Sequence, residues 1–218
     1  MVELGASQAG GTDPALQAKV EAAYADGVRE YQRALAIAPS PALLVKLGHL
    51  HLAVGDIDRA RRAFVEAFTK WPGTPSAYAG LGDTLFAFGD YRGAIENYRN
   101  ALWWQANGPR DAMLDVTGVR LSLAESFVKL HLPGAAINAY QAVLDHCPEA
   151  VEALAGLPRI YIDQQRWVEA LAVLDRWRRV APDDPLLVLE IRRLASGNPD
   201  MDLPDWADAL VGTSLTSP

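Results

Sequence analysis

Two histidines, His49 and His51, stand two residues apart, and Asp56 follows a few positions later. Imidazole and carboxylate groups are zinc ligands, so the stretch GHLHLAVGD suggests a metal site. Residues two apart on a helix point to different faces, however, and cannot hold one ion together. A second stretch, GDTLFAFGD at 82–90, keeps both glycines, the alanine and the final aspartate but replaces the histidines with Asp83 and Leu85. The pattern therefore indicates a repeat, and we expect neither a metal nor a cofactor.

The adjacent His146 and Cys147 are the second candidate for chemistry. A thiol beside an imidazole suggests a nucleophile, but such a pair needs facing side chains and a third, orienting group. The sequence contains no glycine-rich phosphate loop, no HExxH and no paired CxxC. We therefore expect Cys147 to be a half-buried residue at a helix end and the protein not to be an enzyme. The alternative is an accessory or regulatory subunit of an enzyme complex, with weak activity through this pair.

Composition excludes several classes of protein. The chain has 218 residues, of which 50% are hydrophobic, and its net charge of −7 argues against a nucleic-acid partner. Its single cysteine excludes an internal disulfide and is compatible with a reducing compartment. No apolar run approaches the length of a membrane span, and residues 1–14 lack the order of a secretory signal. These features predict a cytoplasmic protein without membrane insertion.

The repeat has a period of 34 residues and the same internal order in each copy. Apolar residues recur at helical spacing, a Gly-Asp pair interrupts them, and a second amphipathic stretch follows, which predicts a helix, a turn and a helix. We expect Gly55 and Gly89 to take the left-handed backbone that ends the first helix, and Asp56 and Asp90 to cap the second. Small residues mark where the two helices approach closely, beside an aromatic ring. These residues are Gly48, Gly82, Ala60 and Ala94, with Phe64 and Tyr98.

The repeat resembles the tetratricopeptide repeat family. The matching residues of the second unit are Leu47, Gly48, Ala60, Phe64, Ala67 and Pro72, and those of the third are Tyr78, Leu81, Gly82, Ala94, Tyr98 and Ala101. The fourth unit matches at Leu123, Ala124, Phe127, Ala136, Tyr140 and Pro148, and the fifth at Leu154, Leu157, Tyr161, Ala170 and Pro182. The resemblance implies an all-α fold, a right-handed superhelical solenoid of antiparallel helix pairs.

The repeats also suggest how the chain is divided. We expect a flexible N-terminus at 1–13, a degenerate first repeat at 14–40, repeats at 41–74, 75–108, 117–150 and 151–184, and an insertion at 109–116. A capping helix at 185–196 and a tail at 197–218 follow. In the first repeat, 14–22 is expected to form a shortened helix of its own before the second helix. In the tail, a short helix near 205–211 is expected to dock on the capping helix around Leu187 to Leu194.

In such a solenoid the first helices line the concave face, and residues that recur once per unit form rows along it. The resemblance places an apolar row at Leu52, Phe86, Val128 and Ile162, a polar row at His49, Asp83, Glu125 and Arg159, and a third row at Val45, Ala79, Leu121 and Ala155. A groove of this kind suits an extended peptide or an amphipathic helix of another protein. We therefore expect a non-catalytic protein–protein interaction scaffold.

Two alternatives concern the partner and the surface. Co-chaperone-like adaptors of this family carry basic residues at set positions of the groove, which here are Val45, His49, Gly80, Gly118 and Ser122. The sequence therefore disfavours that role. Trp103 and Trp104 form a second candidate surface, because adjacent residues on a helix cannot both face the same core. Self-association of the chain is left open.

Overall fold

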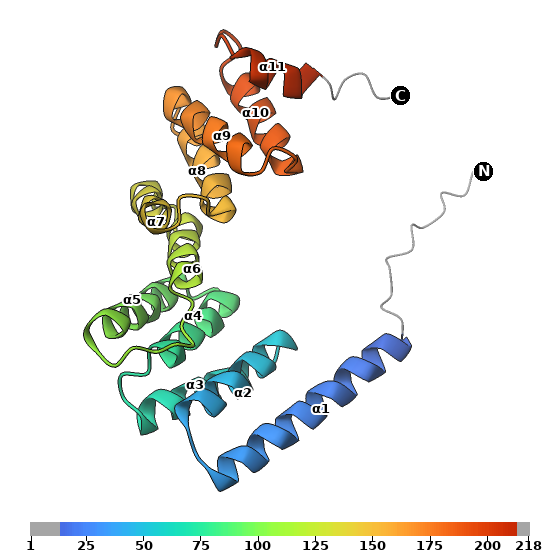
Figure 1. Ribbon diagram of the computed structural model, residues 1–218, viewed down its shortest axis with the longest axis vertical. Coiled ribbons are helices and arrows are strands. Elements are labelled where there is room, and N and C mark those ends of the chain that lie inside the picture. The colour runs from blue at the N-terminus through green and yellow to red at the C-terminus, as the bar shows by residue number, and fades with distance from the viewer. Residues whose placement is uncertain (1–13, 213–218) are drawn as a thin grey trace, which may run out of the picture.

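The computed structural model describes residues 14–212, which form eleven α-helices (Figure 1). The helices are α1 (Pro14–Ile37), α2 (Pro41–Ala53), α3 (Ile57–Lys70), α4 (Pro75–Phe88), α5 (Tyr91–Asn107), α6 (Val116–Lys129), α7 (Pro133–His146), α8 (Val151–Asp163), α9 (Trp167–Val180), α10 (Pro185–Gly197) and α11 (Asp205–Gly212). From α2 to α9 they pack as sequential antiparallel pairs, and each pair contacts the next. The predicted all-α stack of helix pairs is confirmed. The stretch 1–13 lies outside the described residues.

Local signals in the sequence account for the helix ends. The Asp56 and Asp90 carboxylates accept hydrogen bonds from the third backbone N–H after them, at 3.1 and 2.9 Å, and so cap α3 and α5. Gly55 and Gly89 end the preceding helices with φ angles of 77° and 88°. The predicted junctions of the second and third repeats are therefore confirmed.

The later junctions use the same left-handed backbone without glycine. His131 and Gln165 have φ angles of 55° and 59°, a conformation that costs a residue with a Cβ about 1–2 kcal/mol. We expect His131→Gly to raise the free energy of unfolding by about 0.5 kcal/mol, because glycine relieves this strain but makes the unfolded chain more flexible. Urea denaturation followed by circular dichroism measures the change.

Gly55→Ala is the reciprocal control for this substitution. No atom lies within 4 Å of a Cβ built on Gly55, so no clash is expected. The backbone strain should outweigh the lower flexibility of the unfolded chain and give a net loss of about 1 kcal/mol. Equal stability of Gly55→Ala and the wild type would contradict the explanation for both sites.

Aromatic rings fill the space beside small residues between successive repeats. A Cβ added to Gly48 of α2 would lie 2.6 Å from the Phe64 ring, and one added to Gly80 of α4 would lie 2.2 Å from it. Tyr98 lies in the same way against Gly82, with a corresponding distance of 2.5 Å. These distances are shorter than any ordinary contact, so the glycines allow two helices to approach one ring. The close packing predicted at Gly48 and Gly82 is confirmed.

The first repeat differs from the prediction, because α1 is one continuous helix of 24 residues. The expected break after residue 22 does not occur. Ala22, Ala23, Tyr24, Ala25 and Asp26 are all compatible with a helix, and the single Gly27 lowers helix stability by only about 1 kcal/mol. Gly27 instead lies against α2, where a Cβ would be 3.0 Å from Leu50. Residues 15–23 are exposed.

The C-terminal end is covered as predicted. Leu187, Ile191 and Leu194 of α10 are wholly buried, and α11 packs on α10 with Ala207 also wholly buried. The Arg178 guanidinium lies 4.9 Å from the centre of the Trp206 ring, which adds a cation–π contact between α9 and α11. Within residues 14–212, no helix combines the length and hydropathy that crossing a bilayer requires.

Buried residues form three separate cores along the stack. The N-terminal core consists of Leu44, Val45, Ala60, Phe64, Ala67 and Ala77. The middle core consists of Ala79, Ala94, Tyr98, Ala101 and Val119. The C-terminal core contains Ile95 and the buried apolar residues between Ala124 and Ala207, with Trp177 as its largest wholly buried side chain. Each core therefore stabilises a different part of the solenoid.

Candidate functional site

The rows expected along the groove lie on α2, α4, α6 and α8 (Figure 1), and the polar row is the most accessible. His49, Glu125 and Arg159 are exposed, and Asp83 is half-buried. None of the ion pairs that the structure shows between residues 14 and 212 includes Asp83, Glu125 or Arg159. Among the described residues, the charged members of this row therefore have no partner of opposite charge in an ion pair.

The apolar rows are divided between the surface and the core. Val128 is 39% exposed, and Leu52, Phe86 and Leu121 are half-buried. Val45 and Ala79 belong to the N-terminal and middle cores, and Ile162 is only 6% exposed, within the C-terminal core. Val45 and Ile162 consequently have almost no surface to offer to another molecule.

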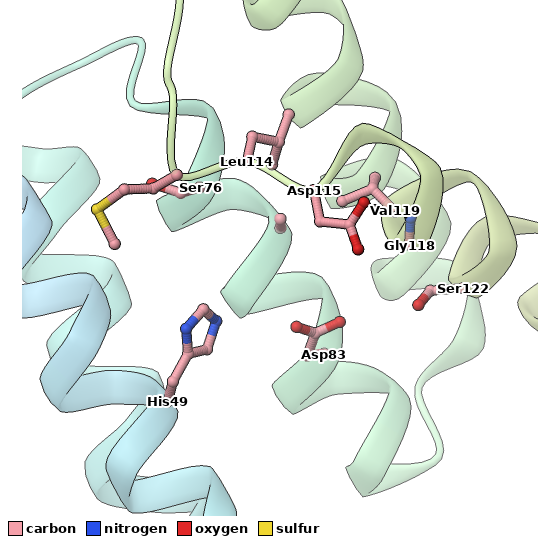
Figure 2. Close-up of a pocket in the computed structure, with 10 residues that line it drawn as sticks. His49, Ser76, Asp83, Leu114, Asp115, Gly118, Val119 and Ser122 are labelled. Atoms are coloured by element: carbon pink, nitrogen blue, oxygen red, sulfur yellow. Dashed lines mark hydrogen bonds between the residues drawn. The ribbon is translucent and has the colours of Figure 1, made fainter. Parts of the chain in front are cut away.

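A pocket of about 220 Å³ opens between α2, α4 and α6 (Figure 2). Its lining residues are His49, Ser76, Ala79, Asp83, Met113, Leu114, Asp115, Gly118, Val119 and Ser122. His49 comes from α2, Asp83 from α4 and Ser122 from α6, while the segment before α6 supplies Met113, Leu114 and Asp115. The structure thus brings two members of the predicted polar row, His49 and Asp83, into one pocket.

Asp83 is held in place by a hydrogen bond from a residue that does not line the pocket. The Tyr98 hydroxyl donates a hydrogen bond to Asp83 Oδ1 at 2.8 Å. Burial raises the pKa of the Asp83 carboxyl above its ordinary value, which outweighs the opposite effects of the Tyr98 hydrogen bond and of His49. The carboxylate is therefore in a place where its charge is poorly solvated.

His49 stands at the rim of the pocket, on α2. Although the residue as a whole is exposed, its ring packs edge-on to Phe64 with the ring centres 5.1 Å apart. This partial burial lowers the pKa of His49 below 6.5, and the nearby charge of Asp83 only partly offsets the effect. The neutral imidazole is consequently favoured at neutral pH.

We expect Asp83→Asn to raise the melting temperature at pH 7. Asparagine keeps an oxygen that can accept the Tyr98 hydrogen bond and removes the poorly solvated charge. A carboxyl whose folded pKa is raised binds more protons in the folded state, so it lowers stability as the pH rises above its ordinary value of 3.8. The advantage of the variant should therefore be largest at neutral pH and shrink as the pH falls towards 3.8. Melting curves across this range would contradict the prediction if the difference were independent of pH.

The histidine pair separates as its spacing predicts, since His51 lies on another face of α2. Its Nδ1 is 2.8 Å from the Tyr24 hydroxyl of α1, and the residue is buried. His51 therefore connects α1 to the repeats. In residues 14–212, no group of three or more His, Cys, Asp or Glu side chains is placed to hold a metal ion.

The His146 and Cys147 side chains have different surroundings. His146 is exposed at the end of α7, and its Nδ1 lies 3.0 Å from the Ala142 carbonyl oxygen one turn earlier. Cys147 is a half-buried free cysteine that packs against the C-terminal core. The contacts of the two side chains thus differ, with the Ala142 carbonyl oxygen beside His146 and the C-terminal core beside Cys147.

The two adjacent tryptophans divide between surface and interior. Trp103 is 56% exposed, whereas Trp104 is half-buried and lies against Gly73 and Gly108. Their rings meet edge-on with centres 4.9 Å apart. Trp103 thus keeps an exposed face on the side of α5, and its role as a contact surface stays a prediction.

Sequence reasoning missed the part of the pocket that the 108–115 segment supplies. Asp111 anchors this segment, because its carboxylate accepts a hydrogen bond from the backbone N–H of Ser76 at 3.0 Å and so caps α4. Met113, Leu114 and Asp115 consequently form one wall of the pocket. The one local signal was Asp115 itself, a helix-capping residue directly before the first turn of α6.

Comparisons with known proteins agree with this architecture. Sequence profiles described as tetratricopeptide repeat match residues 45–112 and 129–188, together more than half of the chain. No curated protein sequence matches the chain.

Several solved structures share the fold. BtubC from P. vanneervenii is 19% identical, with a TM-score of 0.72 over 93% of this chain and 91% of that one. YrrB, described as a TPR protein with an unusual peptide-binding site, is 15% identical, with a TM-score of 0.60 over 86% of this chain and 98% of its own. A chain of the APC/C hetero-tetramer Cut9–Hcn1 is 19% identical, with a TM-score of 0.68, and this chain covers 34% of it.

At such identities the structural likeness shows the fold alone. The matched profiles, the 34-residue period and the stacked helix pairs together identify the family. Tetratricopeptide repeats are in general protein–protein interaction modules, and both profile matches are to this repeat. The chain belongs to the tetratricopeptide repeat family.

Proposed function

We propose that this protein is a non-catalytic scaffold that binds a peptide or an amphipathic helix of another protein along α2, α4, α6 and α8. The observation that carries the proposal is the polar row, whose charged members Asp83, Glu125 and Arg159 are accessible or half-buried and have no ion pair within the described chain. Charged groups arranged in this way select a partner and steer its approach.

The apolar side chains beside the polar row support the same use. Val128 is exposed, and Leu52 and Phe86 keep part of their surface free. Phe86 also packs edge-on to Tyr91, with ring centres 5.3 Å apart, which fixes the orientation of its ring. Fixed apolar side chains next to a polar row suit a bound segment with one apolar and one polar face. That YrrB, a protein of this fold, is described as having a peptide-binding site favours such a partner.

Selection from a phage-displayed library of random twelve-residue peptides tests the proposal. Peptides that bind the immobilised chain are synthesised and titrated against wild type, Phe86→Ala and Glu125→Lys. We expect Phe86→Ala to weaken binding about tenfold, because part of a large apolar side chain loses its burial. We expect Glu125→Lys to change which peptides bind and to act less at high salt, since screening weakens exposed charge pairs.

Val65→Ala is the matched control, because Val65 is a partly exposed apolar residue of α3, outside the rows. It should leave binding unchanged, and circular dichroism confirms that every variant is folded. If Phe86→Ala and Glu125→Lys bind as tightly as wild type while Trp103→Ala abolishes binding, the surface at Trp103 is the binding site and the proposal is wrong.

A further inference from the structure

The pocket between α2, α4 and α6 has the size of one side chain rather than of a small-molecule ligand. Its volume of about 220 Å³ is below the roughly 300–1,000 Å³ of sites for drug-sized molecules. Three helices and the 108–115 segment enclose it, and it lies within the polar row, between His49 and Asp83. A segment bound along the row would therefore pass its mouth.

The charge inside this pocket is negative. Asp83 and Asp115 line it from opposite sides, whereas no lysine or arginine does. Figure 2 shows the carboxylates of both residues and the Ser122 hydroxyl directed towards the same hollow. Asp83 Oδ1 accepts the Tyr98 hydrogen bond and Asp115 Oδ1 accepts one from the backbone N–H of Gly118 at 3.0 Å. Neither carboxylate has an ion pair in the part of the chain that is described.

The remaining walls are apolar. Ala79, Met113, Leu114 and Val119 line the pocket together with the two carboxylates. Lysine and arginine combine a long methylene stem with a cationic end, and they place the stem along apolar surface while the charge meets polar groups. A purely apolar side chain would leave the carboxylates desolvated and unpaired, and an acidic one would be repelled.

We propose that this pocket receives a lysine or arginine side chain of the bound partner segment, with its methylene stem along Leu114 and Val119 and its cationic end between Asp83 and Asp115. The inference rests on the proposed function and names the chemistry of its ligand. Tyr98 acts as a positioning residue, because its hydrogen bond orients Asp83 from outside the pocket. The segment's other contacts then lie along the polar and apolar rows.

The test uses the peptides selected on the full-length wild-type chain. We expect them to share one basic residue at a constant distance from an apolar residue. Each peptide is then made with that basic residue replaced by norleucine, which keeps the methylene stem and removes the charge. Both versions are titrated against wild type, Asp83→Asn and Asp115→Asn. Asparagine retains an oxygen for the Tyr98 hydrogen bond at 83 and for the helix cap at 115.

The norleucine replacement should weaken binding to wild type about tenfold, as expected for a charge-assisted hydrogen bond of about 1.5 kcal/mol. The same replacement should weaken binding to Asp83→Asn and Asp115→Asn by about twofold or less, because these variants have already lost the carboxylate that pairs with the peptide's cation. Glu66→Gln, which removes an exposed carboxylate of α3 outside the pocket, should behave as wild type. Thermal melting confirms that each variant is folded.

Four results would overturn the inference. One is that the selected peptides bind in a way that depends on Phe86 but share no basic residue. Another is that the norleucine replacement weakens binding to wild type and to Asp83→Asn by the same factor. Either result would reject the inference and leave the proposed function standing. If, in the absence of peptide, calcium from calcium chloride binds wild type but not Asp83→Asn, the pocket is a metal site. Failure to select any peptide sensitive to Phe86→Ala or Glu125→Lys would reject the proposed function and this inference together.

Discussion

Replacing Gly80 by alanine should lower the free energy of unfolding by about 3 kcal/mol, at the upper end of the usual cost of adding a methyl group to a packed core. A Cβ at this position would lie 2.2 Å from the Phe64 ring, which is wholly buried. The ring has little room to move, because Gly48 of α2 packs against it as well, and a Cβ added to Gly48 would lie 2.6 Å from it. The strain therefore falls on the contact between α2 and α4, and chemical denaturation measures it.

Gly134→Ala is the control for this substitution, since it makes the same change in the first turn of α7, where no atom lies within 4 Å of the new Cβ. It should cause no loss, because alanine favours a helix over glycine. The double variant Gly80→Ala, Phe64→Leu should recover at least about 1 kcal/mol relative to the sum of the single changes. Strict additivity of the two changes would show that the ring contact is not the cause.

Features encoded within a single repeat could be predicted from the sequence. Gly55 and Asp56 specify a helix end and a helix start through their own backbone and side-chain preferences, so the junction needs no distant contact. The close packing of Gly48 against Phe64 could be predicted by comparing repeats, because the pairing of small and aromatic residues recurs in phase. The continuity of α1 was not predicted, because one glycine among helix-compatible residues is a weak signal in either direction.

Only the part of the candidate site that depends on the 34-residue period of the repeats was predicted. His49 and Asp83 occupy equivalent positions of successive repeats, so their closeness follows from stacking. Met113 and Asp115 come from a segment outside the period, and the Asp111 hydrogen bond to the backbone of Ser76, which holds this segment, joins residues 35 apart in the chain. The burial of Val45 and Ile162 depends likewise on neighbouring helices. Sequence spacing contains no information on contacts of this kind.

The separation of the cores has a consequence for how the molecule unfolds. The N-terminal core is built from α2, α3 and α4, and the C-terminal core mainly from α6 to α11, without a shared residue. In a stack of repeats, stability is approximately a sum of local terms and contacts between neighbours. A defect in one core should therefore loosen the helices around it before it affects those at the other end.

Trp177→Ala should show this most clearly, with an expected loss of about 3–5 kcal/mol. Trp177 is wholly buried in the C-terminal core, so its removal leaves a large cavity beside α9, which packs against α8 and α10. Hydrogen exchange should become faster in these helices and stay unchanged in α2 and α3, because local opening is governed by local stability. Trp103→Ala, which truncates a tryptophan that is 56% exposed, should change stability by no more than about 0.5 kcal/mol. A uniform increase in exchange from α1 to α11 would instead mean that the chain unfolds as one cooperative unit, and that the separate cores do not act independently.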